Sequence, residues 1–156
     1  MRRFERLGVD AQRLELRDNS GHSAMLAQYG EVDIALDSFP FNGGMTTLEA
    51  LWMGVPVLTI AGDTIVSRQT VSALANIGLD AQLAFADVDA YVAGAVALAK
   101  DPNRLAELRQ QLRPRMAASP LRQSEHFVRD LEALYRTLWQ TWCASASGSP
   151  ERAGAT

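Results

Sequence analysis

The residues best suited to chemistry lie in a glycine-rich turn in the first third of the chain. Asn42, Gly43 and Gly44 follow an apolar run, and Thr46 and Glu49 stand at the start of a helical pattern. The spacing predicts Thr46 as a helix N-cap and Glu49 as its capping-box partner. A glycine turn that leads into a helix N-terminus presents free backbone N–H groups and the positive end of the helix dipole. This combination suits a phosphate group, and Glu49 could accept hydrogen bonds from a ribose.

The same turn also has a simpler interpretation. Asn-Gly-Gly followed by Thr-Thr is an ordinary connection between a strand and a helix, and a lone glycine motif is a weak signal of binding. From the spacing alone, a phosphate site and a purely structural turn both remain open.

Composition restricts the class of protein. The 156 residues suffice for one domain or part of a larger one, and 47% of them are apolar, which is enough for a core. A net charge of −3 argues against a nucleic-acid partner. No apolar run approaches the roughly 20 residues that span a bilayer, and the first residues lack the apolar stretch of a secretory signal. The single cysteine, Cys143, favours a reducing compartment, so we expect a cytoplasmic protein without a membrane partner.

Strands and helices alternate along the first 85 residues. Strands are predicted near 14–16, 32–36, 57–60 and 83–85, and helices at 3–7, 22–29, 46–53 and 67–76, the last closed by Gly78. Alternation at this spacing predicts right-handed crossovers and a parallel sheet of about four strands with helices on both faces.

The last third of the chain is predicted to be helical, over 87–99, 102–117 and 124–144. An apolar stripe in the final helix has the spacing that usually indicates core packing; it consists of Phe127, Leu131, Leu134, Tyr135, Leu138 and Trp142. Residues 145–156 are small and polar, and we expect them to be disordered. The two histidines, His22 and His126, are far apart in sequence and have no further ligand at metal spacing, so no metal site is expected.

Many further positions, in a fixed order, match one family. They comprise residues 30–37, Phe39 to Gly44, Thr46, Thr47, Glu49 to Val57, Gly62, Asp63, Ser67, Arg68, Ser72, Leu74, Gly78, Leu79, Tyr91, Ala99 to Asp101, Leu105, Leu108, Arg109, Ser119 to Leu121, Phe127, Leu131, Glu132, Leu134, Tyr135 and Trp139. This set closely resembles the O-linked N-acetylglucosamine transferases and their SPINDLY-like bacterial relatives. The resemblance covers nearly the whole chain except its tail.

The resemblance implies a fold and an activity. The family has the GT-B architecture, in which two Rossmann-like halves face each other across a cleft. Residues 1–144 resemble the later portion of the C-terminal, donor-binding half, truncated at its N-terminus. Family members transfer N-acetylglucosamine from UDP-N-acetylglucosamine to serine or threonine hydroxyls, with inversion and without a metal cofactor, whereas SPINDLY-like members use a fucose donor. In full-length relatives an N-terminal tetratricopeptide-repeat array presents the acceptor protein.

The resemblance also implies a UDP-sugar site. Its residues would be Gly43, Gly44, Met45 and Thr46 at the diphosphate, Glu49 at the ribose, His22 near the uridine, and Asn42 shaping the turn. It implies no catalytic residue in this chain, because the acid/base groups belong to the other half, and we expect the isolated chain to transfer no sugar. Two functions stay open: the donor-binding part of a transferase that works with its missing N-terminal half, or a non-catalytic remnant or interaction module.

Overall fold

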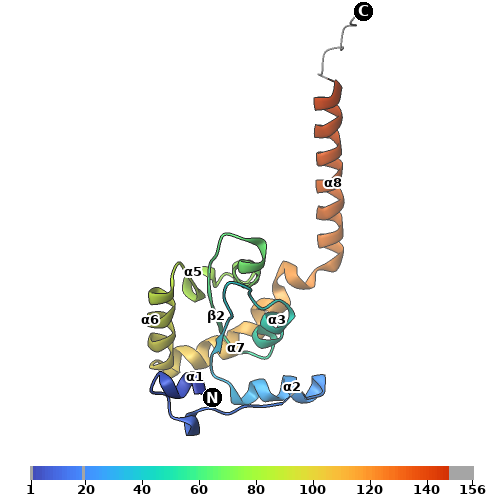
Figure 1. Ribbon diagram of the computed structural model, residues 1–156. Helices are drawn as coiled ribbons and strands as arrows, with labels where there is room; N and C mark the ends of the chain where they lie inside the picture. The colour runs from blue at the N-terminus through green and yellow to red at the C-terminus, as the bar shows by residue number, and fades with distance from the viewer. Residues whose placement is uncertain (1, 19, 148–156) are drawn as a thin grey trace, which may run out of the picture.

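The computed structural model describes residues 2–18 and 20–147, and its centre is a small parallel sheet (Figure 1). Three strands make up the sheet, in the order β1-β2-β3: β1 (Ala35–Leu36), β2 (Val57–Ile60) and β3 (Ala84–Phe85). Both pairings are parallel, with Ala35 opposite Val57 and Thr59 opposite Ala84. The predicted α/β fold with a parallel sheet is therefore confirmed.

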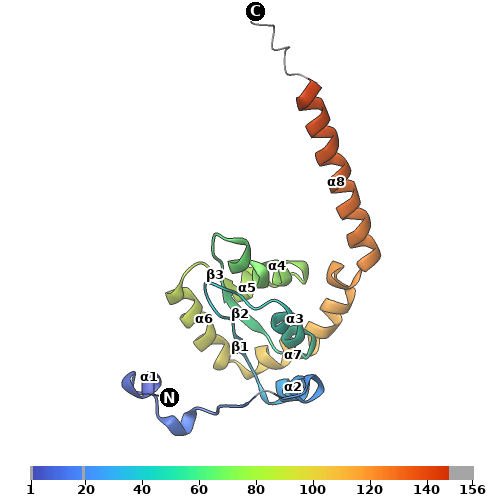
Figure 2. The same ribbon diagram turned by 45° about the vertical axis from the view of Figure 1, so that its right-hand side comes forward.

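Helices surround this sheet. The α-helices are α1 (Arg2–Arg6), α2 (His22–Gln28), α3 (Met45–Trp52), α4 (Gln69–Asn76), α5 (Asp80–Leu83), α6 (Val88–Ala99), α7 (Pro102–Ala118) and α8 (Ser124–Ser147). Short 3₁₀ helices are η1 (Ala11–Arg13), η2 (Tyr29–Glu31), η3 (Ile65–Ser67) and η4 (Pro120–Arg122). The strands lie between α6 on one side and α3 on the other, and α7 packs against both helices (Figure 2).

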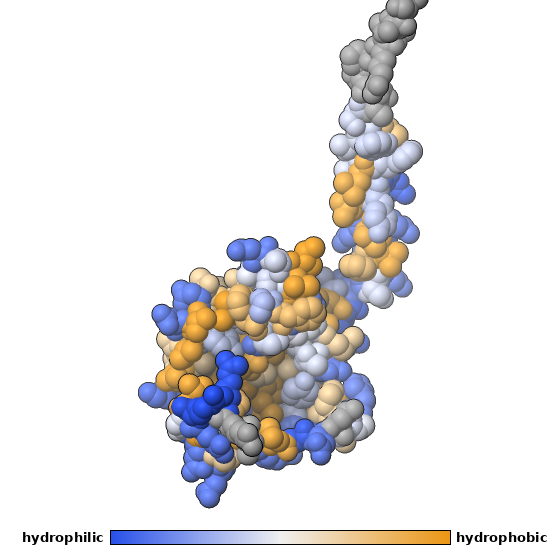
Figure 3. Space-filling view, viewed as in Figure 1, coloured by the Kyte–Doolittle hydropathy of each residue, from blue (hydrophilic) through white to orange (hydrophobic). Residues whose placement is uncertain are grey.

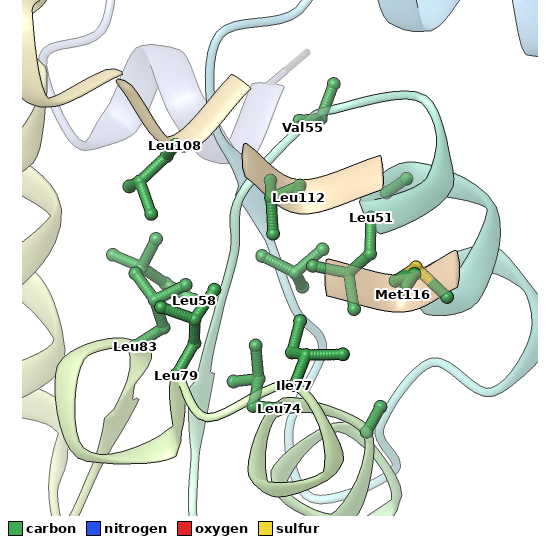
Figure 4. Packing of buried hydrophobic residues seen from close by; sticks show 13 residues of the cluster. Leu51, Val55, Leu58, Leu74, Ile77, Leu79, Leu83, Leu108, Leu112 and Met116 are labelled. Carbon is green, nitrogen blue, oxygen red and sulfur yellow. The ribbon is translucent and has the colours of Figure 1, made fainter. Parts of the chain in front are cut away.

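The core forms around β2. Val57, Leu58 and Thr59 are all buried, as expected for a central parallel strand that is covered on both faces. Apolar side chains from α3, α4, α7 and the segment around α5 converge on this strand (Figure 4). Leu58 and Leu112 are completely enclosed. This packing holds the N-terminus of α3 in a fixed position relative to the carboxyl ends of the strands.

Glycines close two of the helices that flank the sheet. Gly54 after α3 and Gly78 after α4 have φ angles of 86° and 69°, a region that side chains other than glycine rarely adopt. Beyond Gly78, the N–H of Leu79 donates to the Leu74 carbonyl, which completes a Schellman ending. The predicted role of Gly78 is confirmed.

The strand predicted at 14–16 is absent from the described structure. Residues 14–16 pair with no strand in the described residues, and Leu16 is largely exposed. A strand exists only through backbone hydrogen bonds to a neighbouring strand, and these residues make none within the described sheet. The sheet therefore has three strands instead of four.

The last helix, α8, projects away from the rest of the molecule (Figures 1 and 2). Its apolar stripe was predicted to pack in the core, and this prediction is wrong: Phe127, Leu134, Tyr135, Leu138 and Trp142 are more than half exposed. Figure 3 shows apolar side chains along this helix with nothing against them. The helix extends to Ser147, three residues into the predicted tail, and residues 148–156 lie outside the described part of the chain. In the part that the structure describes, no helix is both long and apolar enough to cross a bilayer.

Candidate functional site

The turn between β1 and α3 is anchored by a carboxylate at the end of β1. Asp37 Oδ1 accepts a hydrogen bond from the backbone N–H of Gly43 over 2.7 Å, and its Oδ2 accepts one from the Thr59 hydroxyl over 2.7 Å. The Tyr91 hydroxyl donates to the Asp37 carbonyl over 3.4 Å. Asp37 therefore ties the turn to β2 and α6. Sequence reasoning missed this role, although a polar residue at the carboxyl end of a parallel strand was the available signal.

Two threonines hold the turn from the other side. The hydroxyls of Thr47 on α3 and Thr70 on α4 both donate to the Gly43 carbonyl, over 3.1 Å and 3.2 Å, and lie 3.0 Å from each other. A Cβ at Gly43 would come within 2.7 Å of the Thr47 hydroxyl and 2.9 Å of the Thr46 hydroxyl. Glycine is required at this position because the backbone and the threonines approach so closely.

The start of α3 differs from the prediction. The helix begins at Met45 with Gly44 as its N-cap, and the predicted capping box between Thr46 and Glu49 does not form. The N–H of Leu48 donates to the Gly44 carbonyl over 3.2 Å, so this carbonyl receives the first helical hydrogen bond. Thr46 is thus the second residue of the helix. The earlier start reflects the tight fixing of the turn by Asp37 and the threonines.

Open hydrogen-bond donors remain at this helix end. Among the described residues, the backbone N–H groups of Met45 and Thr46 have no acceptor. Thr46 is exposed, and the Met45 side chain is 69% exposed. Free N–H groups at the positive end of a helix dipole are suited to an anion.

A pocket of about 230 Å³ opens beside these donors, between η2, the end of β1 and the first turn of α3. Its polar lining consists of Tyr29, Asp37, Ser38, Gly43, Thr46 and Thr47. A second hollow, of about 510 Å³, is lined by Gly44, Leu48, Arg68, Leu121 and neighbouring residues. Gly43 therefore lines one pocket and Gly44 lines the other.

His22 and Glu49 were both predicted as site residues, and the structure brings them into contact although they are 27 residues apart in sequence. His22 Nε2 lies 2.8 Å from Glu49 Oε1. The Tyr29 hydroxyl donates to the Thr46 carbonyl over 3.3 Å and joins the same corner. Burial, reinforced by the nearby Glu49 carboxylate, raises the pKa of the Tyr29 hydroxyl. The segment formed by α2 and η2 is thus fastened to α3 at the edge of the pocket.

His22, Met45 and Glu49 line neither of the two pockets, and Asn42 differs from all the other predicted site residues in being fully buried. Its side chain is 1% exposed; the amide Nδ2 donates to the Ser38 carbonyl, and the backbone N–H donates to the Val66 carbonyl, each over 3.0 Å. Its Oδ1 is enclosed and has no partner among the described residues. Asn42 therefore supports the turn from inside and does not line either pocket.

These features define a class of protein. A parallel sheet with flanking helices, and a glycine turn that enters a helix at the carboxyl edge, form a Rossmann-like α/β domain. The profile of glycosyl transferase family 41 matches residues 2–131, and the chain belongs to this family.

Individual relatives agree with this assignment. The chain is 40% identical over 142 residues to the probable UDP-N-acetylglucosamine–peptide N-acetylglucosaminyltransferase SPINDLY of Solanum lycopersicum, covering 90% of this chain and 15% of that protein. It is 40% identical over 151 residues to the corresponding protein of Hordeum vulgare, covering 96% of this chain and 16% of that protein. A solved mutant of the Thermobaculum terrenum O-GlcNAc transferase is 38% identical and superposes with a TM-score of 0.84, over 93% of this chain and 28% of that one.

The resemblance to the O-GlcNAc transferases and the GT-B type of fold are thereby confirmed. The chain spans about a sixth of the length of the two plant relatives and little more than a quarter of the solved transferase chain. In the described residues, no group of three or more His, Cys, Asp and Glu side chains is arranged to hold a metal ion.

Proposed function

We propose that this chain is the donor-binding part of a cytoplasmic, inverting protein O-glycosyltransferase and that its donor is UDP-N-acetylglucosamine. The single observation that carries the proposal is the pair of open N–H groups of Met45 and Thr46, at a helix start whose turn is anchored by Asp37 and two threonines. Membership of family 41 supplies the class of donor for this anion-binding arrangement.

The chemistry of the site follows from its charge. When the sugar leaves, negative charge develops on the β-phosphate of UDP. Met45 and Thr46 present their N–H groups, and Thr46 also its hydroxyl, to that charge, and the α3 dipole adds to the attraction. These donors are already in place, so they stabilise the leaving group without reorganisation and without a metal. Glu49 would accept hydrogen bonds from the ribose, and His22 lies beside it.

Calorimetric titration with UDP and UDP-N-acetylglucosamine tests the proposal. Thr46→Ala should weaken UDP binding by about 1.5–3 kcal/mol, the usual contribution of a hydrogen bond to a charged group. Thr137→Ala makes the same chemical change on the exposed surface of α8, far from the turn, and should leave the affinity unchanged. A wild-type chain without affinity for UDP, or equal affinities for wild type and Thr46→Ala, would contradict a diphosphate site at this turn.

The exposed apolar face of α8 supports a second element of the proposal: this face docks onto the remainder of the transferase polypeptide. Phe127, Leu134, Leu138, Trp139 and Trp142 are each more than half exposed on one 24-residue helix. Aromatic side chains of this kind concentrate at the centres of protein interfaces. The length of the solved transferase indicates what covers this face. This chain matches 28% of that transferase, so most of the transferase polypeptide lies outside the matched region and can supply the partner surface. An N-terminal repeat domain would present the acceptor protein.

A chimera tests this docking. The matched region of the Thermobaculum terrenum transferase is replaced by this chain, and sugar transfer to acceptor peptides is measured. We expect transfer by the chimera, a large loss with Leu138→Glu, and little change with Arg136→Glu, since Arg136 is a charged residue on the same helix. Equal activity of both variants would contradict the docking of α8.

The alternative function is a binding module that keeps the fold and performs no transfer. The unpartnered face of α8 is equally consistent with it, since such a face suits any protein partner. In both cases the isolated chain should transfer no sugar, because it contains one side of a two-sided cleft. An inactive chimera that still binds UDP would favour the binding module.

A further inference from the structure

The contact between His22 and Glu49 joins two helices, and the two side chains differ strongly in their exposure to solvent. His22 is the first residue of α2, and its side chain is 69% exposed, whereas the side chain of Glu49 in the second turn of α3 is 14% exposed. A carboxylate only accepts hydrogen bonds, so Nε2 of His22 carries the hydrogen and donates a hydrogen bond to Oε1. An exposed imidazole therefore fixes a carboxylate that is largely buried.

The second oxygen of this carboxylate remains available. Glu49 Oε2 accepts no hydrogen bond from the described residues, and it is not enclosed. Tyr29, the other polar group near this carboxylate, directs its hydroxyl to the Thr46 carbonyl instead. One oxygen of Glu49 is thus hydrogen-bonded to His22, and the other can accept a hydrogen bond from a ligand. Glu49 lies on α3, the helix whose first turn carries the free N–H groups.

We propose that His22 is a positioning residue, which orients the Glu49 carboxylate so that Oε2 accepts a hydrogen bond from a ribose hydroxyl of the bound nucleotide. This inference rests on the proposed UDP site. It differs from the role implied by the family resemblance, in which His22 lies near the uridine, because its Nε2 is committed to Glu49.

The physical reason is conformational. A glutamate side chain has three rotatable bonds, and a ligand that must order them loses the corresponding entropy on binding. The hydrogen bond from His22 restricts Glu49 before the nucleotide arrives. The ribose then meets an acceptor in a fixed place, so a nucleotide with both hydroxyls is favoured over one that lacks the contacted hydroxyl.

The measurement is the ratio of affinities for UDP and for its 2′-deoxy and 3′-deoxy analogues, obtained by calorimetry. All three ligands carry the same diphosphate, so the ratio reports the ribose contact alone. For the wild type we expect a preference of about tenfold for UDP over one deoxy analogue, as for one hydrogen bond to a charged group. Glu49→Ala should abolish this preference. His22→Ala should reduce it severalfold, and His22→Gln, which keeps a side-chain N–H donor, should restore part of it.

A control separates this role from a general loosening of α2. Ser20→Ala removes the hydrogen bond that the Gln28 side chain, at the end of α2, donates to the Ser20 hydroxyl just before the helix over 3.3 Å, so it loosens the α2 segment itself without touching Glu49. We expect the wild-type ratio in Ser20→Ala. An unchanged ratio in His22→Ala, or an equal fall in Ser20→Ala, would overturn the inference and leave the UDP site standing. A wild-type ratio of one would also overturn it, whereas a wild type that binds no UDP would overturn the proposed function itself.

Discussion

Asp37 and Gly43 are joined by a hydrogen bond that closes the whole loop between β1 and α3, from the Gly43 N–H to the Asp37 Oδ1 over 2.7 Å. The other oxygen of Asp37 accepts from the buried Thr59 hydroxyl. Both oxygens of the carboxylate therefore accept hydrogen bonds within the protein. These bonds hold the side chain against the loop and β2, beside the proposed diphosphate site.

Replacement of Asp37 tests this anchor. Asp37→Ala should lower the free energy of unfolding by about 1–3 kcal/mol, because it leaves the Gly43 N–H and the Thr59 hydroxyl without their partner. Urea denaturation measures the change, and UDP titration should show a parallel loss of affinity. Asp33→Ala is the matched control: this carboxylate is 84% exposed and lies 4.0 Å from Arg109, so its removal should change stability by less than about 0.5 kcal/mol. Equal effects of the two substitutions would refute the anchoring role.

The two glycines of the turn should respond differently to alanine. Gly43→Ala places a methyl group against the Thr46 and Thr47 hydroxyls, and overpacking of this kind costs about 1–3 kcal/mol. Gly44→Ala meets only the end of the flexible Gln69 side chain, at 2.9 Å, so the change should stay below about 1 kcal/mol. Thermal unfolding of both variants makes the comparison. Gly44→Ala proving the more damaging would show that the crowding has been assigned to the wrong residue.

The exposed stripe of α8 should contribute little to the stability of the chain. Leu138→Ser should change the free energy of unfolding by less than about 0.5 kcal/mol, because Leu138 is 57% exposed and touches no core residue. Leu112→Ala, at a completely enclosed position on α7, should cost about 2–5 kcal/mol. Denaturant titration distinguishes the two. A large loss with Leu138→Ser would mean that the stripe packs against the domain in solution.

Trp52 on α3 contacts one arginine of α7 and one of η4, the short helix that precedes α8. The guanidinium groups of Arg113 and Arg122 lie 5.1 Å and 4.9 Å from its ring centre, and Arg113 also donates to the Trp52 carbonyl over 2.8 Å. Arg122→Gln should cost about 0.5–1 kcal/mol, the usual value of an exposed cation–π contact. Arg113→Gln should cost more, because a hydrogen bond is lost as well. Arg129→Gln on α8, which lacks a ring contact, serves as the control in the same unfolding experiment. Stability equal to that of the control would show that the ring contact contributes nothing.

Local sequence determined much of the fold. Apolar runs predicted strands at 32–36, of which the structure keeps 35–36, and at 57–60. Gly54 and Gly78 marked the ends of α3 and α4, because glycine tolerates the positive φ that these positions adopt. Asp87 was expected at the start of a helix, and its side chain accepts from the Ala90 N–H as a cap does. The helix ends and the cap depend on residues within one turn of one another, so the local sequence contains their cause.

Only the tertiary structure decided the remaining features, because each depends on a partner that is distant in sequence. Residues 14–16 have the composition of a strand but no neighbouring strand, and the stripe of α8 has the spacing of a core helix but no surface against it. Thr46 and Glu49 have the spacing of a capping box, yet Gly44 begins the helix and Glu49 binds His22, 27 residues earlier in the chain. The sequence shows that a residue can donate a hydrogen bond or that a helix has an apolar face. Which residue accepts that bond or covers that face depends on the tertiary packing.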